Sequence, residues 1–85
     1  RIAYAQLCDG PAVLPEEAWG MEATEERLYP GEGDFPLAAI VRALPPGTPL
    51  AVEAPSRSRR ARGLSPAARA QEALAATRRV LAEAL

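Results

Sequence analysis

The sequence predicts an α/β fold in which two parallel strands alternate with two helices. Two short apolar runs, near residues 2–8 and 50–54, have the length of strands and end at Gly or Pro residues. Two longer stretches, near residues 35–44 and 66–85, carry apolar side chains at helical spacing. Because a helix joins the two strands, we expect them to be parallel and their connection to be right-handed.

The first strand-like run is largely apolar on both faces, which is typical of parallel sheets covered by helices. Gly10 and Pro11 end the run and leave Gln6 and Asp9 near its carboxyl end. Alternation divides the side chains between two faces, with Ile2, Tyr4, Gln6 and Cys8 on one and Ala3, Ala5 and Leu7 on the other.

The segment between the first strand and the first helix is predicted to be a long acidic loop with one or two helical turns. A dense run of turn-forming residues, 29–36, ends it, and Asp34 is placed to cap the helix that follows. The side chains expected to be buried on that helix fall at i, i+3, i+4 and i+7 and are Leu37, Ile40, Val41 and Leu44.

The second strand-like run, residues 50–54, also ends on a polar side chain. Ala51 and Glu53 share one face of it. The carboxyl ends of parallel strands meet at one edge, so Gln6, Asp9 and Glu53 are expected at that edge. Chemistry collects there in α/β sheets and barrels.

The C-terminal part is predicted to be an Arg-rich loop, residues 55–65, followed by a long helix. Ser65 is placed to cap this helix, and Pro66 suits its first turn. The inner face expected from helical spacing consists of Ala67, Ala70, Leu74, Thr77, Leu81 and Ala84.

Composition narrows the class of protein. The single cysteine, Cys8, and the absence of histidine exclude an intramolecular disulfide and a Cys/His zinc site. Cys8 fits a reducing, cytoplasmic setting, and no apolar run approaches the ~20 residues of a membrane span. The net charge of −1 argues against a nucleic-acid partner.

Two strands cannot close a core alone, so we expect the 85 residues to belong to a larger sheet or barrel.

Four stretches together carry a resemblance to a known superfamily: QLCDGP at 6–11, EA at 22–23, RLYPGEGDFPL at 27–37 and VEAP at 52–55. They resemble the C-terminal part of the xylose-isomerase-like TIM barrels, which include sugar phosphate isomerases and epimerases, hydroxypyruvate isomerase and inosose dehydratase. The resemblance covers nearly the whole chain. It implies that residues 1–85 are the seventh and eighth strand-helix units of one (β/α)8 TIM-barrel domain. Residues 11–34 and 55–65 would then be loops on its active-site side.

The resemblance implies a divalent metal ion, Mg²⁺, Mn²⁺, Co²⁺ or Zn²⁺, held by four side chains at strand ends. Gln6 would be the seventh-strand ligand, and Glu53 the eighth-strand ligand and catalytic acid/base. The other two ligands belong to strands outside this chain, so the 85 residues alone are expected to be inactive. The implied reaction is isomerisation or epimerisation of a sugar, sugar phosphate or keto acid by proton abstraction next to a carbonyl, through an enediolate. Gln6 stands where keto-sugar epimerases have His, and in this it is more similar to hydroxypyruvate isomerase.

Four further residues receive weaker roles. By the same likeness, Asp9 and Arg27 would lie near the substrate. Arg57 and Arg59 follow the second strand, where TIM barrels often bind phosphate. Each residue also has a purely structural interpretation: a turn-forming carboxylate at Asp9, a solvated Arg-rich loop, a hydrogen-bonded amide at Gln6 and an ion-paired carboxylate at Glu53.

Three other functions remain open from the sequence. A lyase of the inosose or dehydroshikimate dehydratase type would use the same metal and the same proton abstraction. A non-enzymatic module could bind an acidic partner through its Arg-rich loop. The chain is also expected to self-associate through exposed strand edges and apolar surface. The His-rich endonuclease branch of the superfamily fits worse, because the chain has no histidine.

Overall fold

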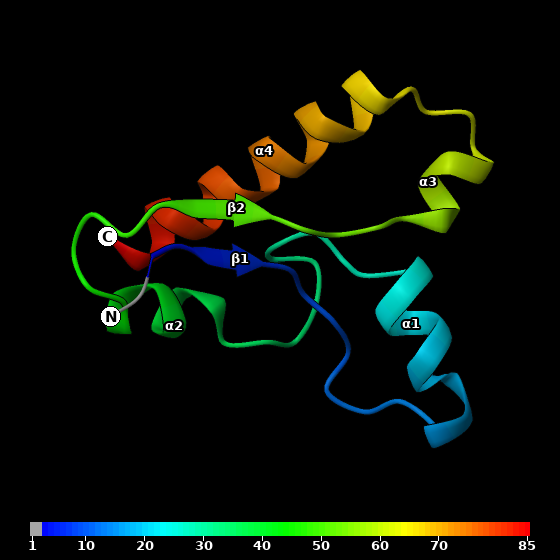
Figure 1. Ribbon diagram of the computed structural model, residues 1–85, viewed down its shortest axis with the longest axis horizontal. Coiled ribbons are helices and arrows are strands. Elements are labelled where there is room, and N and C mark those ends of the chain that lie inside the picture. Colours follow the sequence, from blue (N-terminus) through cyan, green and yellow to red (C-terminus); the bar gives the residue numbers. More distant parts are fainter. Residues whose placement is uncertain (1–2) are drawn as a thin grey trace.

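The structure confirms a mixed α/β chain with two parallel strands (Figure 1). The computed structural model describes residues 3–85, so the predicted start of the first strand at Ile2 lies outside the described residues. Ala5 pairs with Leu50 and Leu7 with Val52. The elements in chain order are β1 (Ala5–Leu7), the 3-10 turn η1 (Glu16–Ala18), α1 (Trp19–Glu25), α2 (Leu37–Ala43), β2 (Leu50–Val52), α3 (Arg57–Ala61) and α4 (Pro66–Ala84).

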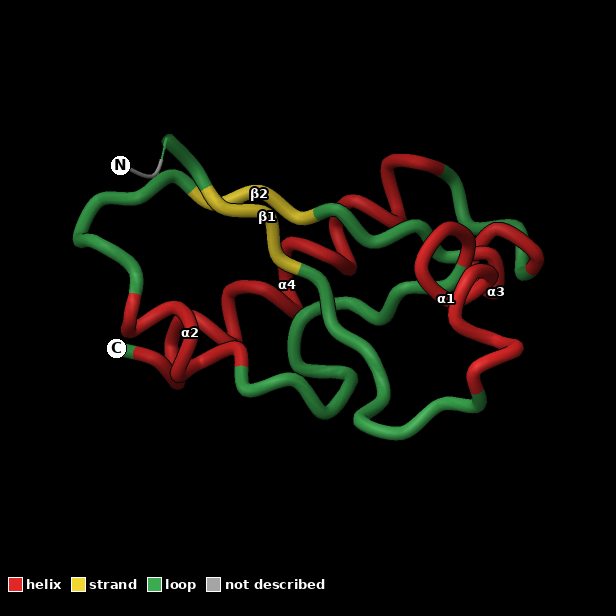
Figure 2. The backbone as a smooth tube through the Cα atoms, turned by 60° about the horizontal axis from the view of Figure 1, so that its bottom comes forward, coloured by secondary structure: helices red, strands yellow, loops and turns green. Residues whose placement is uncertain are grey.

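The helices cover only one face of this small sheet. Helix α4 packs against β2 and α2, and in Figure 2 both helices lie beneath the two strands. Leu7 is buried on the covered face, whereas Tyr4, Gln6 and Glu53 are exposed on the opposite face. A parallel sheet is normally covered on both faces, so the open face with its polar side chains is the unusual feature of the fold.

The core lies between the covered face of the sheet and the C-terminal half of α4. The buried residues of α4 are Ala76, Thr77, Val80 and Ala84, which confirms Thr77 and Ala84 as inward-facing. Leu74 was predicted to be buried but is 49% exposed, because α4 reaches the sheet and α2 mainly with its last turns.

Helix α2 is buried along a narrower stripe than its apolar spacing predicts. Leu37 is buried, as expected, but Ile40 is 43% exposed. The helix has only seven residues and packs mainly against α4, so its Ile40 side is only partly covered within the described chain. The prediction that Asp34 caps α2 is also wrong. Pro36 precedes the helix, and Asp34 Oδ2 instead accepts the Ala12 N–H at 2.9 Å.

The first loop follows β1 and the second follows β2, and both lie beyond the arrowheads of these strands in Figure 1. Each loop contains a short helix. The helical turns expected between residues 11 and 34 are confirmed as η1 and α1. The Arg-rich segment was expected to be a loop, but its first part forms α3, because the Ser56 hydroxyl accepts the Arg59 N–H and caps it. The cap of α4 is confirmed, since Ser65 Oγ accepts the Ala68 N–H at 3.1 Å.

Within residues 3–85, each helix is too short or too polar to cross a lipid bilayer.

Candidate functional site

Gln6 and Glu53 lie next to each other on the open face of the sheet. Gln6 belongs to β1, and Glu53 follows β2 directly, held in line by its own N–H, which donates to the Leu7 carbonyl at 3.1 Å. The Gln6 side chain donates from Nε2 to Glu53 Oε2 at 3.3 Å. The folded chain therefore brings together the two side chains for which the family resemblance implies metal ligation.

A groove of about 430 Å³ opens beside this pair. The strands and the start of the second loop form one side of it, and α1 with the segment that follows forms the other. The polar groups and small side chains that line the groove come from Gln6, Cys8, Thr24, Arg27 and Glu53, with Leu7, Ala23 and Pro55 completing the wall. Three of the six residues proposed for the site thus share one cavity, while Cys8 and Thr24 were not foreseen there.

Arg27 is held rigidly at the wall of the groove. Its Nη1 donates to both carboxylate oxygens of Glu22, at 2.7 and 3.0 Å, and its Nη2 donates to Cys8 Sγ at 3.1 Å. The guanidinium also lies over the Phe35 ring, 5.4 Å from its centre. The hydrogen bond to Cys8, together with Glu22, raises the pKa of Arg27 above its ordinary value against the opposing effect of burial. The guanidinium is therefore charged at all physiological pH values, and both of its terminal nitrogens have partners within the chain.

Asp9 is almost completely buried, with 1% of its surface exposed. Its Oδ1 accepts the N–H groups of Gly10 and Phe35, at 2.8 and 3.0 Å, and its Oδ2 accepts that of Gly31 at 3.0 Å. A Cβ at Gly33 would lie only 2.5 Å from Asp9 Oδ1, so the turn can approach the carboxylate only because residue 33 is glycine. This placement favours the turn-forming role of Asp9 over a substrate contact.

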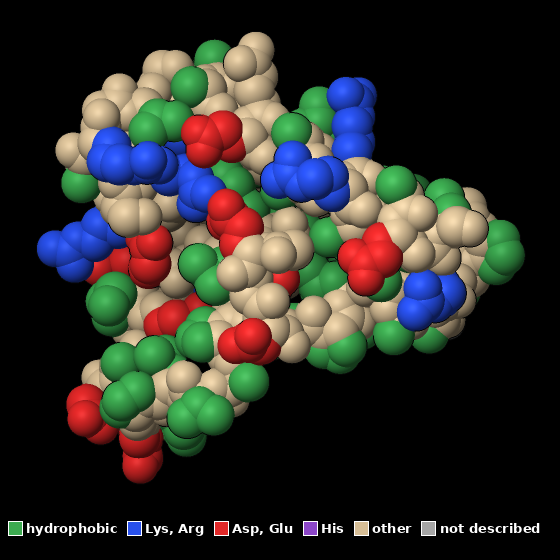
Figure 3. All heavy atoms as spheres, turned by 180° about the vertical axis from the view of Figure 1, so that it is seen from behind, with side chains coloured by type: hydrophobic (Ala, Val, Ile, Leu, Met, Phe, Trp, Pro, Cys, Tyr) green, Lys and Arg blue, Asp and Glu red, His purple; other side chains and the backbone are tan. Residues whose placement is uncertain are grey.

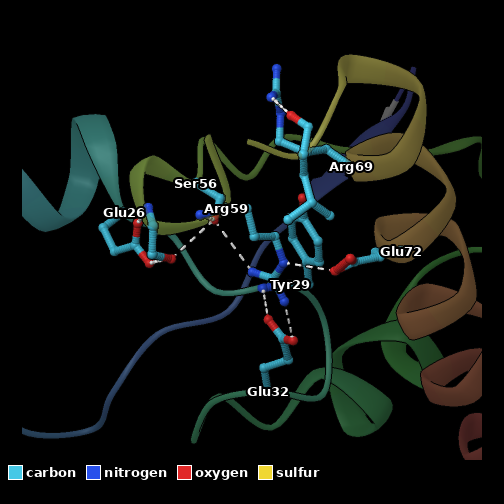
Figure 4. A network of polar contacts seen from close by, with 9 residues as sticks. Glu26, Tyr29, Glu32, Ser56, Arg59, Arg69 and Glu72 are labelled. Carbon is cyan, nitrogen blue, oxygen red and sulfur yellow. Dashed lines mark hydrogen bonds and ion pairs between the residues drawn. The ribbon is translucent and has the colours of Figure 1, made fainter. Parts of the chain in front are cut away.

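Arg59 is the centre of a polar network that joins both loops to α4 (Figure 4). Its Nε donates to Glu72 Oε1 at 3.1 Å, and its Nη2 donates to Glu32 Oε2. The guanidinium stacks on the Tyr29 ring, 3.8 Å from the centre, and the side chain is only 12% exposed. Burial lowers the pKa of Arg59, but Glu72 and Glu32 outweigh it and raise that pKa above the usual range. Arg59 is thus surrounded by protein groups rather than presented to a phosphate.

Arg57, the other arginine proposed for phosphate binding, behaves differently. Its side chain is 65% exposed and donates to Glu25 Oε2 at 3.0 Å. It lies on α3 and does not line the groove beside Gln6 and Glu53. The structure therefore separates both loop arginines from the paired amide and carboxylate.

The two loops are also joined by a backbone hydrogen bond and by the side chain of Glu26. The Arg27 N–H donates to the Pro55 carbonyl at 2.8 Å, and Glu26 accepts the N–H and the hydroxyl of Ser58 at 2.9 and 2.7 Å. Burial raises the pKa of Glu26, but the Ser58 hydrogen bonds outweigh it and leave that pKa below its ordinary value. A carboxyl with a lowered pKa stabilises the fold above its unfolded pKa, and this contribution is lost as the pH falls through the folded pKa.

Replacing Arg59 by methionine is expected to lower the free energy of unfolding by about 2–3 kcal/mol, since it removes charge-assisted hydrogen bonds and a cation–π contact in a largely desolvated place. Urea denaturation of the protein would measure the change. Arg57→Met is the matched control on the same helix. Its exposed ion pair is worth roughly 0–1 kcal/mol. Equal urea midpoints for the two variants would show that the network does not hold the loops together.

The described residues provide only part of a metal site. Within residues 3–85, no cluster of three or more His, Cys, Asp or Glu side chains is arranged to hold a metal ion. The pair of Gln6 and Glu53 offers one amide and one carboxylate, so further ligands would have to come from elsewhere.

The partners of the two partly buried arginines, Arg27 and Arg59, were missed by sequence reasoning. Tyr29, Glu32 and Glu72 lie 13 or more residues from Arg59 in the sequence. Glu22 precedes Arg27 by five residues, which is not a separation that places two side chains together on a helix. Only the density of acidic residues in the first loop could have signalled that its carboxylates pair with the basic residues of the second.

Comparison of the chain with protein-family profiles, with curated proteins and with solved structures finds no match.

Proposed function

We propose that this chain carries the seventh- and eighth-strand metal ligands of a divalent-metal-dependent sugar isomerase or epimerase with a (β/α)8 barrel. The observation that carries the proposal is the contact between Gln6 and Glu53, 3.3 Å apart on the open face of two parallel strands. Both residues lie toward the carboxyl ends of the strands and line one groove with Arg27. In barrels and open α/β sheets this end is where substrates bind.

The arrangement of layers supports a barrel. In a (β/α)8 barrel, helices cover the outer face of the strands, and the inner face points to the shared interior. Here α4 lies against one face, and the other carries the exposed Gln6 and Glu53. Each described strand has one neighbour, so one edge of each is open to pairing with further strands.

The chemistry of the two side chains fits a hard divalent cation. Amide and carboxylate oxygens are ligands that suit Mg²⁺ and Mn²⁺. Both side chains are exposed on the same face, and Gln6 presents Oε1 in place of Nε2 when its amide rotates about its last bond. The resident ion would polarise the substrate carbonyl and lower the barrier to proton loss at the adjacent carbon.

The residues of this chain then have separate tasks. Glu53 accepts the proton removed beside the carbonyl, or returns it to the other face, because a carboxylate in hydrogen-bond reach of the substrate acts as a general base. Gln6 would hold the ion through Oε1, and in its present rotamer its Nε2 keeps the Glu53 carboxylate beside it. The loop that carries Arg27 forms one side of the groove. A dehydratase would use the same first step, and a hydroxyl leaving group on the substrate would decide between the two outcomes.

The proposal is tested with the complete protein expressed from the gene that encodes this chain. In D₂O, proton NMR of a panel of ketoses should show exchange of the hydrogen next to the carbonyl. Chelation with EDTA should abolish the exchange, and added Mn²⁺ should restore it. No exchange with any ketose or keto acid, or exchange that survives chelation, would contradict the proposed function.

A further inference from the structure

The charge of the groove bears on which substrate the site takes. A phosphate or carboxylate group is usually recognised by Arg or Lys side chains whose donors are available to it. In TIM barrels the loops after the seventh and eighth strands often form the phosphate site. By the proposed function these are the loops that follow β1 and β2, so their arginines should reveal whether the substrate carries an anionic group.

Among residues 3–85, Arg27 is the one cation that lines the groove, and its charge is already offset by Glu22. Arg27 meets both oxygens of Glu22 through Nη1 and Cys8 Sγ through Nη2, and its face is covered by Phe35. The Glu22 carboxylate offsets the charge of this guanidinium and so weakens its attraction for an anionic substrate group. The other charged residue in the described part of the lining is Glu53, which repels an anion.

The remaining arginines of the second loop are either paired or outside the groove. Arg59 is enclosed by Glu32 and Glu72. Arg57 and Arg62 are exposed and do not line the groove. Arg60 lines a different cavity, between the segment after β2 and α4, on the helix side of the sheet. Figure 3 shows, on the face seen from behind, arginine side chains interspersed with acidic ones rather than gathered in one patch.

We infer that the site takes an uncharged polyhydroxy carbonyl compound, an unphosphorylated sugar, rather than a sugar phosphate or sugar acid. The inference rests on the proposed function and narrows it. Hydroxyl groups need donors and acceptors of the kind that Gln6, Thr24 and Glu53 provide along the groove. Glu22 already offsets the charge of Arg27, so little net positive charge is left in the described lining of the groove to attract a substrate anion.

The test compares matched substrates with the complete, metal-loaded protein. D-ribulose and D-fructose are paired with D-ribulose 5-phosphate and D-fructose 6-phosphate, and proton exchange in D₂O is followed for each. We expect kcat/KM to be at least 10-fold higher for the free sugars. A preference for the phosphorylated sugars would overturn this inference and leave the proposed function standing. Exchange with neither set, nor with any other ketose, would overturn both.

A variant then probes the residue responsible. Glu22→Gln should release Arg27 and reduce the preference for free sugars by roughly 10-fold or more, because a charge-assisted hydrogen bond to phosphate becomes available. Glu25→Gln is the matched control, since Glu25 lies on the same helix but pairs with Arg57 outside the groove. An unchanged preference in Glu22→Gln would show that Glu22 does not exclude anions from the site.

Discussion

Replacing Asp9 by alanine is expected to lower the free energy of unfolding by about 3–5 kcal/mol. The carboxylate accepts three backbone N–H groups from Gly10, Gly31 and Phe35 in a buried place. Loss of the acceptor leaves these donors without a partner, and each buried unsatisfied group costs about 1–3 kcal/mol. The expected loss is smaller than three such costs added together, because the turn can relax and admit water. An 85-residue chain has roughly 4–13 kcal/mol of total stability, so the loss would be large.

Urea denaturation followed by circular dichroism would measure this change. Asp34→Ala is the matched control, because Asp34 is exposed and accepts one N–H, from Ala12. Its loss is expected to cost less than about 1 kcal/mol. An Asp9 variant as stable as the Asp34 variant would mean that the turn at 31–35 holds its shape without the buried carboxylate. Asp9→Asn should also lower the free energy of unfolding, because its amide NH₂ group would face backbone N–H donors and could not accept from them.

The second large effect is expected at Glu53. Glu53→Gln should reduce kcat for proton exchange by about 10²–10⁴-fold, the range that general acid–base catalysis contributes. Its urea midpoint should change little, because the Glu53 side chain is exposed and, among residues 3–85, its hydrogen bond is to the Gln6 amide alone. Thr24→Ser is the matched control in the same groove, where it keeps a hydroxyl able to donate to the Gly20 carbonyl. Equal activity in both variants would remove Glu53 from the reaction.

Much of the fold follows from local sequence signals. The parallel pairing of β1 and β2 was predictable because a helix connects them. The cap of α4 at Ser65 was predictable because Ser followed by Pro is a strong start signal. In contrast, the exposure of Ile40 and Leu74 depends on where α2 and α4 lie relative to the sheet. Helical spacing identifies an apolar side, but it does not say which part of that side finds a neighbour.

The candidate site also combines contacts that the sequence predicts with contacts that it does not. Proximity of Gln6 and Glu53 follows from parallel strands whose carboxyl ends meet at one edge, so it was predictable. The pairing of Arg59 with Glu32 and Glu72 was not, because it depends on how two loops and α4 come together. The Asp34 cap was a plausible local signal, but tertiary contact with Ala12 took precedence over it.

The most direct test of the paired ligands is calorimetric titration of the metal-free complete protein with Mn²⁺. If Gln6 and Glu53 bind the ion, Gln6→Ala and Glu53→Gln should each weaken Mn²⁺ binding by more than the roughly 10–100-fold that loss of a supporting residue costs. Thr24→Ser should bind Mn²⁺ like the unaltered protein. Unchanged Mn²⁺ affinity in Gln6→Ala and Glu53→Gln would show that the two side chains meet on the sheet without forming a metal site.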